Sequence, residues 1–234
     1  MGVPKLTVAS IHCGTMTRRA LTFSLGGLAA LSVMPSCSAK ASPTRRLLQY
    51  EGTHSVYGGI GTYTNHIDEQ DKLIIIRTVV RLSVSFLGIV LYRESADRIE
   101  QWADDRLLAF RGETTINGNA SLVKGEARGD VFIITSPQGT IVAPASVRPS
   151  NPSSNHFLRS DTMMLSDSGM IQHVRISQPT SVTIIINQVS MHAQEYRIDA
   201  TPSYKVWLDE RDVPVMFAVY DESGVVTFTL SQRT

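Results

Sequence analysis

The feature that most constrains the fold is a run of alternating residues at positions 74–86. Its even-numbered positions are apolar apart from Thr78, whereas the odd-numbered positions include the polar residues Arg77 and Arg81. Side chains alternate between the two faces of a β-strand, so this pattern predicts a strand with one buried face. The run has about thirteen residues, against roughly 5–6 in a usual strand. Strands of this length are typical of strongly curved sheets, in which bulges relieve the twist.

Shorter apolar runs separated by turn residues extend this pattern along the chain. They predict strands at residues 98–102, 107–115, 131–135, 181–187, 191–200, 204–208, 213–220 and 225–230. Gly88 is the candidate for a bend after the long strand. The segment 144–162 is rich in proline and serine and predicts a crossover between two groups of strands. Within it, Ser154 is a candidate cap for one short helix near 155–165.

These elements predict a mostly β protein in which residues 42–234 form a single domain. We expect a long, curved antiparallel sheet, either a half-open barrel or a β-roll, with at most that one short helix. The roughly 193 residues after Ala41 are enough for one domain with a substantial core.

Residues 1–41 have the composition of a cleaved export signal. They contain four basic residues and no Asp or Glu, and Arg18 and Arg19 precede an uncharged, mostly apolar run at 20–33. As a helix these fourteen residues would reach about 21 Å, short of the roughly 30 Å hydrocarbon core of a bilayer. They therefore predict a signal peptide, not a membrane span. The paired arginines resemble a twin-arginine signal.

Two processing routes remain open for this signal. Residues 39–41, Ala-Lys-Ala, fit the small-residue cleavage pattern, and we favour this site, which starts the mature chain at residue 42. Alternatively, residues 34–37 resemble a lipoprotein box, which would attach a lipid to Cys37. Translation can also start at Met16. By either route we expect a bacterial protein that is exported to the periplasm or secreted.

The charge of the remaining chain argues against a nucleic-acid partner. Lys and Arg total 22 and Asp and Glu total 21, and four of the basic residues lie in the signal, so the remainder has a net charge of −3. We expect no transmembrane span in the mature chain. Both cysteines, Cys13 and Cys37, lie before residue 42. The body therefore has no disulfide, cysteine–zinc site or cysteine nucleophile.

No sequence motif identifies catalytic residues, a metal site or a cofactor site. There is no G-x-S-x-G or H-E-x-x-H pattern, and the body's histidines lack the close spacing of a metal pair. These are His54, His66, His156, His173 and His192. The glycine-rich segment 58–61 continues into a strand instead of a helix, which favours a β-bulge over a phosphate-binding loop.

Several short motifs, taken in order, resemble a family of uncharacterised exported bacterial proteins, domain of unknown function family 6134. The matching segments are Tyr57 to Gly61, Tyr92-Arg93, Glu100 to Trp102, Thr114 to Gly118, Gly139 with Pro144, and Val206 to Asp209. This resemblance implies a predominantly β domain outside the cytoplasm. It implies no particular substrate, cofactor or catalytic residue.

Three hypotheses for the function follow. The first is non-enzymatic binding of an apolar or lipid-like ligand, or an apolar part of an envelope component, in the concave face of the sheet. The second is an envelope module that binds another protein through an edge strand or loop. The third is a hydrolase or lyase whose active site is assembled from distant strands. An exposed concave face would favour the second, and carboxyl groups of perturbed pKa beside a histidine would favour the third. The sequence does not indicate an oligomeric state.

Overall fold

The computed structural model describes residues 44–234 of the chain. The export signal, with Arg18, Arg19, Cys37 and the cleavage site at 39–41, lies outside these residues. Within the described part, no helix has the length and apolar character needed to cross a membrane.

Most of the described residues lie in one antiparallel sheet of fourteen strands. Its strands are β1 (Thr44–His54), β2 (Gly58–Gln70), β3 (Leu73–Phe86), β4 (Ile89–Ala103), β5 (Arg106–Ile116), β6 (Asn119–Arg128), β7 (Val131–Ser136), β8 (Gly139–Pro144), β12 (Arg175–Ile176), β13 (Thr180–Ile186), β14 (Val189–Asp199), β15 (Ser203–Leu208), β16 (Pro214–Asp221) and β17 (Gly224–Arg233). The spatial order is β12-β14-β15-β16-β17-β1-β2-β3-β4-β5-β6-β7-β8, with β13 also paired to β14. The first and last strands, β1 and β17, therefore pair in the middle of the sheet.

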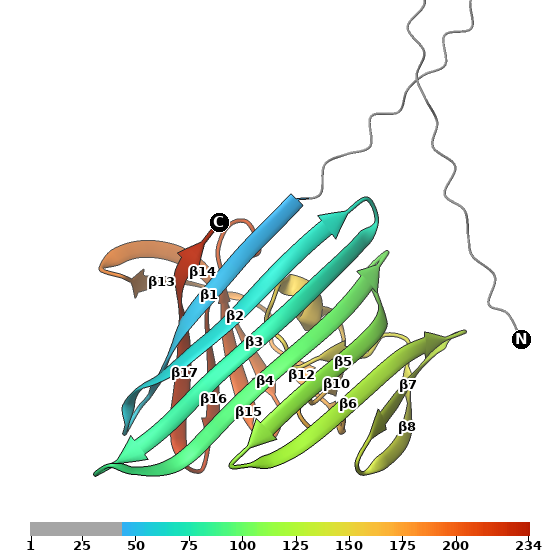
Figure 1. The fold of residues 1–234 in the computed structure, drawn as a ribbon. Helices are drawn as coiled ribbons and strands as arrows, with labels where there is room; N and C mark the ends of the chain where they lie inside the picture. Colours follow the sequence, from blue (N-terminus) through green and yellow to red (C-terminus); the bar gives the residue numbers. More distant parts are fainter. Residues whose placement is uncertain (1–43) are drawn as a thin grey trace, which may run out of the picture. The chain divides into compact units, whose positions relative to one another are not determined.

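The sheet is strongly curved and is not closed into a barrel, because β8 at one end of the order does not pair with the strands at the other end. Figure 1 shows β1–β6 side by side in front, running diagonally across the view, with β14–β17 behind them. Register shifts within the pairs β1–β2, β3–β4 and β4–β5 mark the bulges that accompany this curvature. The predicted mostly β fold with a long curved antiparallel sheet is confirmed.

The alternation in β3 has the predicted register. Ile76, Val80, Leu82 and Val84 are buried on the concave face. Arg77 and Arg81 are exposed on the other face. The strand ends at Phe86, and Gly88, the candidate for a bend after it, belongs to a full reversal of the chain. It lies in a two-residue turn with Leu87, at which the chain reverses into β4.

A crossover segment, residues 145–174, connects β8 to β12 and contains a second, three-stranded sheet. Its strands are β9 (Arg148–Pro149), β10 (Thr162–Met164) and β11 (Ile171–His173). The expected helix is a single 3₁₀ turn, η1 (Asn155–Arg159), and Ser154 caps it by accepting a hydrogen bond from the His156 N–H at 3.2 Å. The helix does not extend to 165 because residues 162–164 pair with β9 and β11 instead.

The core fills the space between the concave face and the crossover segment. Phe157, Met163 and Met164 of the crossover segment belong to the same buried cluster as the inward residues of β1–β8 and of β14–β17. Four aromatic rings pack where the first and last strands of the described residues meet. They are Tyr50, Tyr63, Phe217 and Phe228, with ring centroids 4.7 to 6.3 Å apart.

Candidate functional site

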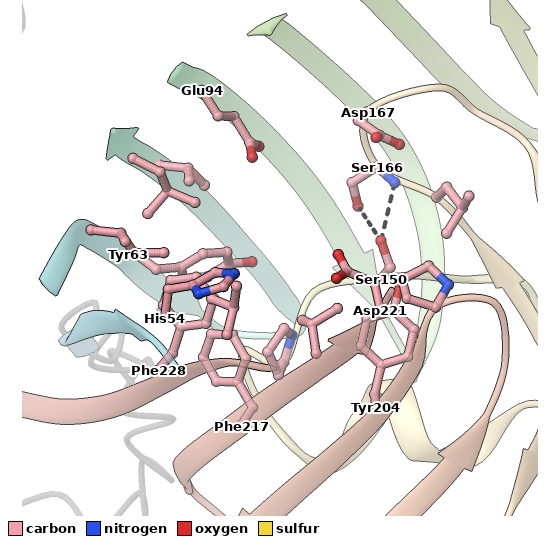
Figure 2. Close-up of a pocket in the computed structure, with 18 of the residues that line it drawn as sticks. His54, Tyr63, Glu94, Ser150, Ser166, Asp167, Tyr204, Phe217, Asp221 and Phe228 are labelled. Carbon is pink, nitrogen blue, oxygen red and sulfur yellow. Dashed lines mark hydrogen bonds between the residues drawn. The ribbon is translucent and has the colours of Figure 1, made fainter. Parts of the chain in front are cut away.

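The main candidate site is a cavity of about 610 Å³ in the concave face of the sheet. One wall is formed by β1–β4, the opposite wall by β15–β17, and the crossover segment contributes further lining residues. Figure 2 shows these contributions, with Tyr63 and Glu94 on one side, Phe217 and Tyr204 on the other, and Ser150 of the crossover segment between them. Residues far apart in the sequence therefore line one space.

Most of the side chains that line the cavity are apolar. The alternation of β3 directs Val80, Leu82 and Val84 into it, and Phe217 and Phe228 contribute the facing aromatic surface. Such a lining favours apolar ligand groups.

One charged pair lies inside this apolar lining. The Arg98 guanidinium is 3.1 Å from Glu94 Oε1, and the two side chains are 8% and 13% exposed. The Tyr92 hydroxyl donates to Glu94 Oε2 at 2.7 Å. Burial and the adjacent Glu94 carboxylate raise the pKa of Tyr92, so it stays a neutral donor. The two charges compensate one another, and the cluster offers hydrogen-bonding groups without a net charge.

Further polar groups reach the cavity from the crossover segment and from the opposite wall. The Ser150 and Ser166 hydroxyls are 3.3 Å apart, and the Ser166 N–H donates to Ser150 Oγ at 3.1 Å. Asp167 and Asp221 also line the cavity. These groups can orient the polar part of a ligand but do not form a catalytic triad.

A buried hydrogen-bond network fixes the crossover segment against the sheet. Asn151 accepts from the Tyr63 hydroxyl at 2.7 Å and donates to Thr78 Oγ1 at 3.0 Å and to Glu100 Oε1 at 2.6 Å. The indole N–H of Trp102 donates to the other oxygen of Glu100 at 2.9 Å. Burial raises the pKa of Glu100 from 4.5 to about 7, although the hydrogen bonds from Asn151 and Trp102 oppose this change.

Glu100 also lines a second, much smaller hollow of about 50 Å³, together with Asp105 and His156. The His156 ring contacts the Asp105 carboxylate, and Arg148 donates to the Asp105 carbonyl oxygen at 2.8 Å. Burial raises the pKa of Asp105, but the hydrogen bond with His156 and the nearby guanidinium groups outweigh this effect and hold the pKa below its ordinary value. Glu100 and His156 therefore line one hollow, but the carboxylate in contact with His156 is that of Asp105, and the hollow has room for water and not for a substrate.

The structure does not bring the five histidines together. His54 is buried at the end of the large cavity and His156 contacts Asp105, whereas His66, His173 and His192 are exposed. Among the described residues, no three His, Cys, Asp or Glu side chains group closely enough to hold a metal ion.

The glycine-rich segment has the expected structure, and the large aromatic side chains divide between the interior and the rim. Gly61 lies beside the register shift between β1 and β2, with a φ of +134°, so the bulge interpretation of the glycine segment is confirmed. Trp102 and Tyr63 are buried in the core, whereas Trp207 is buried in a separate apolar cluster with Val215, and Tyr57 is exposed at the rim of the cavity.

The charged and polar residues of the two hollows were not predicted from the sequence. A signal for three of them is present, because Glu94, Arg98 and Glu100 share the even-numbered face of β4 with the buried residues Ala96 and Trp102. Charged residues on the inward face of a strand indicate a buried polar site. Asn151 carries no such signal, because its partners lie far away in the sequence.

Comparison with solved structures supports the fold. The chain is similar to the crystal structure of a β-barrel-like protein of domain of unknown function DUF1849 from Brucella abortus, with a TM-score of 0.59. The match covers 81% of this chain and 96% of that one at 7% sequence identity, so it concerns the fold alone.

Comparison with curated proteins gives no match. A family model, domain of unknown function DUF6134, matches residues 58–231. These residues are most of the chain and include β2–β4 on one wall of the cavity and β15–β17, up to residue 231, on the other. The chain therefore belongs to the DUF6134 family.

Proposed function

We propose that this protein binds an apolar or lipid-like ligand in the concave face of its sheet and does so without catalysing a reaction. The observation that carries this proposal is the cavity of about 610 Å³ with its largely apolar lining. Cavities of roughly 300–1,000 Å³, apolar with a few convergent polar groups, are typical of small-molecule sites.

The arrangement of the lining suggests how the ligand lies. Its apolar part packs between Val80 and Leu82 on one wall and Phe217 on the other. Its polar part hydrogen-bonds near the Glu94–Arg98 pair. Because those charges compensate one another, a neutral or zwitterionic polar group fits better than one with a net charge.

The apolar contribution is large enough for stable binding. Each buried methylene contributes about 0.8 kcal/mol, so a chain of about fourteen would contribute roughly 11 kcal/mol before costs. Association entropy and ordering of the chain remove a large part of this, which leaves an affinity on the order of micromolar or tighter.

This arrangement favours ligand binding over the two alternatives. A protein-binding module would present an open concave face, but here the crossover segment covers part of that face and leaves a lined cavity. An enzyme would need room for substrate beside Glu100 and His156, and the hollow there is about 50 Å³.

Ligand retention and a cavity-filling variant test the proposal. Native mass spectrometry of gently purified protein should show a discrete adduct that organic extraction removes. The extracted protein should then bind a fluorescent lipid with an uncharged polar group, such as a labelled fatty alcohol, saturably and melt at a higher temperature with it.

Val219→Trp places an indole in the cavity and should weaken binding about tenfold or more, equivalent to about two lost methylenes. Val79→Trp, on the opposite face of β3, is the control and should bind normally. A bare mass together with no saturable binding of the probe would refute the proposal.

We also propose that the chain is exported through the twin-arginine route. The support is the sequence around Arg18 and Arg19, with an acid-free basic flank and a short apolar run. Changing both arginines to lysine should leave an uncleaved cytoplasmic precursor, and normal export of that variant would contradict the route. Intact mass then separates a mature start at residue 42 from a lipid on Cys37.

A further inference from the structure

One end of the sheet carries an exposed apolar tip, which we define as Val56–Tyr57 in the β1–β2 turn and Phe86–Leu91 around the β3–β4 turn. Leu87 is 86% exposed, Val56 69% and Ile89 66%. The two turns are neighbours, since the rings of Tyr57 and Phe86 have centroids 6.4 Å apart. In Figure 1 both turns lie at the lower end of the sheet. Exposed apolar groups that cluster in this way mark an interaction surface.

The tip lies at an opening of the large cavity. Tyr57 and Leu91 both line that cavity and are both exposed to solvent. An apolar path therefore leads from the outside of the molecule, across the tip, to the interior.

The charges around the tip are also unusual for a turn region. Residues 55–63 and 83–92 contain no Asp or Glu. Arg93 follows the tip on β4, and Arg81 precedes it on the same face of β3. The turns at the opposite end are charged, with Asp71-Lys72 between β2 and β3 and Asp104-Asp105 between β4 and β5. The neighbouring β16–β17 turn carries Asp221 and Glu222, which limits the apolar contact to the β1–β4 side.

We propose that the apolar tip inserts into the surface of a lipid bilayer that contains anionic lipid, with Arg93 and Arg81 at the level of the phosphates. Consecutive residues from Phe86 to Leu91 are exposed, so both faces of the ribbon present apolar groups. A fluid hydrocarbon layer can cover both faces of such a ridge, whereas a folded protein surface covers one. Basic residues beside an inserted apolar segment add attraction to anionic lipid. This inference goes beyond ligand binding and does not depend on it, because a protein with an empty cavity would still insert.

A tryptophan reporter tests insertion in the full chain. Leu87→Trp is measured in vesicles of phosphatidylcholine and phosphatidylglycerol that carry brominated acyl chains, which quench inserted indoles. Ile185→Trp is the matched control, because Ile185 is 74% exposed and lies near the β13–β14 turn. The emission of the parent, from the buried Trp102 and Trp207, is subtracted.

We expect the vesicles to quench most of the added emission at position 87 and little at position 185. Arg93→Gln in the reporter chain should raise the lipid concentration for half-quenching about fivefold, as expected for one basic residue near an anionic surface. Ile89→Trp is a second reporter if Leu87→Trp does not fold. Equal quenching at the tip and at position 185 overturns the proposal. The proposal is also overturned if the tip is not quenched and the protein forms oligomers that the double variant Leu87→Ser, Ile89→Ser disperses. That result would assign the tip to self-association.

Discussion

Glu100 allows a quantitative test of the buried network that holds the crossover segment over the cavity. Its carboxyl group is fully buried, accepts hydrogen bonds from Asn151 and Trp102, and has a pKa raised from 4.5 to about 7. The folded state therefore holds this proton more tightly than the unfolded chain does. Below about pH 4.5 both states are protonated, and the contribution of Glu100 to stability is fully present.

As the pH rises from about 4.5 to about 7, the unfolded chain loses the proton first, and the free energy of unfolding falls. At about 1.4 kcal/mol per pH unit, this loss amounts to roughly 3 kcal/mol, and no further change from Glu100 follows above pH 7. Carboxyl groups whose pKa is lowered in the folded state change the free energy of unfolding at more acidic pH and do not mask the effect of Glu100. These are Asp97, Asp105, Glu195 and Asp221.

The assay is urea unfolding at several pH values between about 5 and about 7.5, with tryptophan fluorescence as the signal. In Glu100→Gln the decrease across this range should disappear. At pH 5 the variant should also be about 1–3 kcal/mol less stable, because its amide nitrogen faces one of two N–H donors. Glu113→Gln, at an exposed position of β5, should keep the slope of the parent. A parent whose stability is constant or rises over this range would refute the reasoning, as would an unchanged slope in Glu100→Gln.

Two further substitutions test the sheet itself. Val80→Asp should lower the free energy of unfolding by more than about 4 kcal/mol, because it buries an unpaired charge, whereas Ser83→Asp on the exposed face should change it by less than about 0.5 kcal/mol. Equal stability of these two variants in urea would contradict the register of β3. Gly61→Ala should cost about 2–6 kcal/mol, since its φ is +134° and a Cβ atom would lie 2.0 Å from the Arg81 carbonyl oxygen. Gly59→Ala, with no atom near the added carbon, should melt at or above the temperature of the parent.

The parts of the fold that sequence reasoning predicted are those determined by local patterns. Alternation along residues 74–86 was sufficient to place Val80 and Leu82 on the buried face, because strand periodicity is a property of neighbouring residues. The turn at Leu87-Gly88 was missed for an equally local reason. Both residues have positive φ, as two-residue hairpin turns require, but leucine is not among the residues that usually signal such a turn.

The candidate site was less predictable because it depends on contacts between distant segments. The alternation along β4 predicts that Arg98 and Glu100 point to the inner face of the sheet, but it does not predict their roles. Arg98 lines the cavity beside Glu94, whereas Glu100 is covered by Asn151, about fifty residues later in the chain. Which charged group faces open space and which one is enclosed is therefore decided by the path of the crossover segment.

The two proposed activities place different demands on this fold. The walls of the cavity come from both ends of the described chain and meet where β1 pairs with β17. The stacked rings of Phe217 and Phe228 lie at this junction, with their centroids 4.7 Å apart. Neither wall encloses a cavity alone, so a ligand that contacts both stabilises that pairing by mass action. The apolar tip, in contrast, belongs to the β1–β4 wall alone. Weakening the packing at Phe217 should therefore abolish ligand binding while leaving insertion at Leu87 intact, and this difference separates the two activities within one molecule.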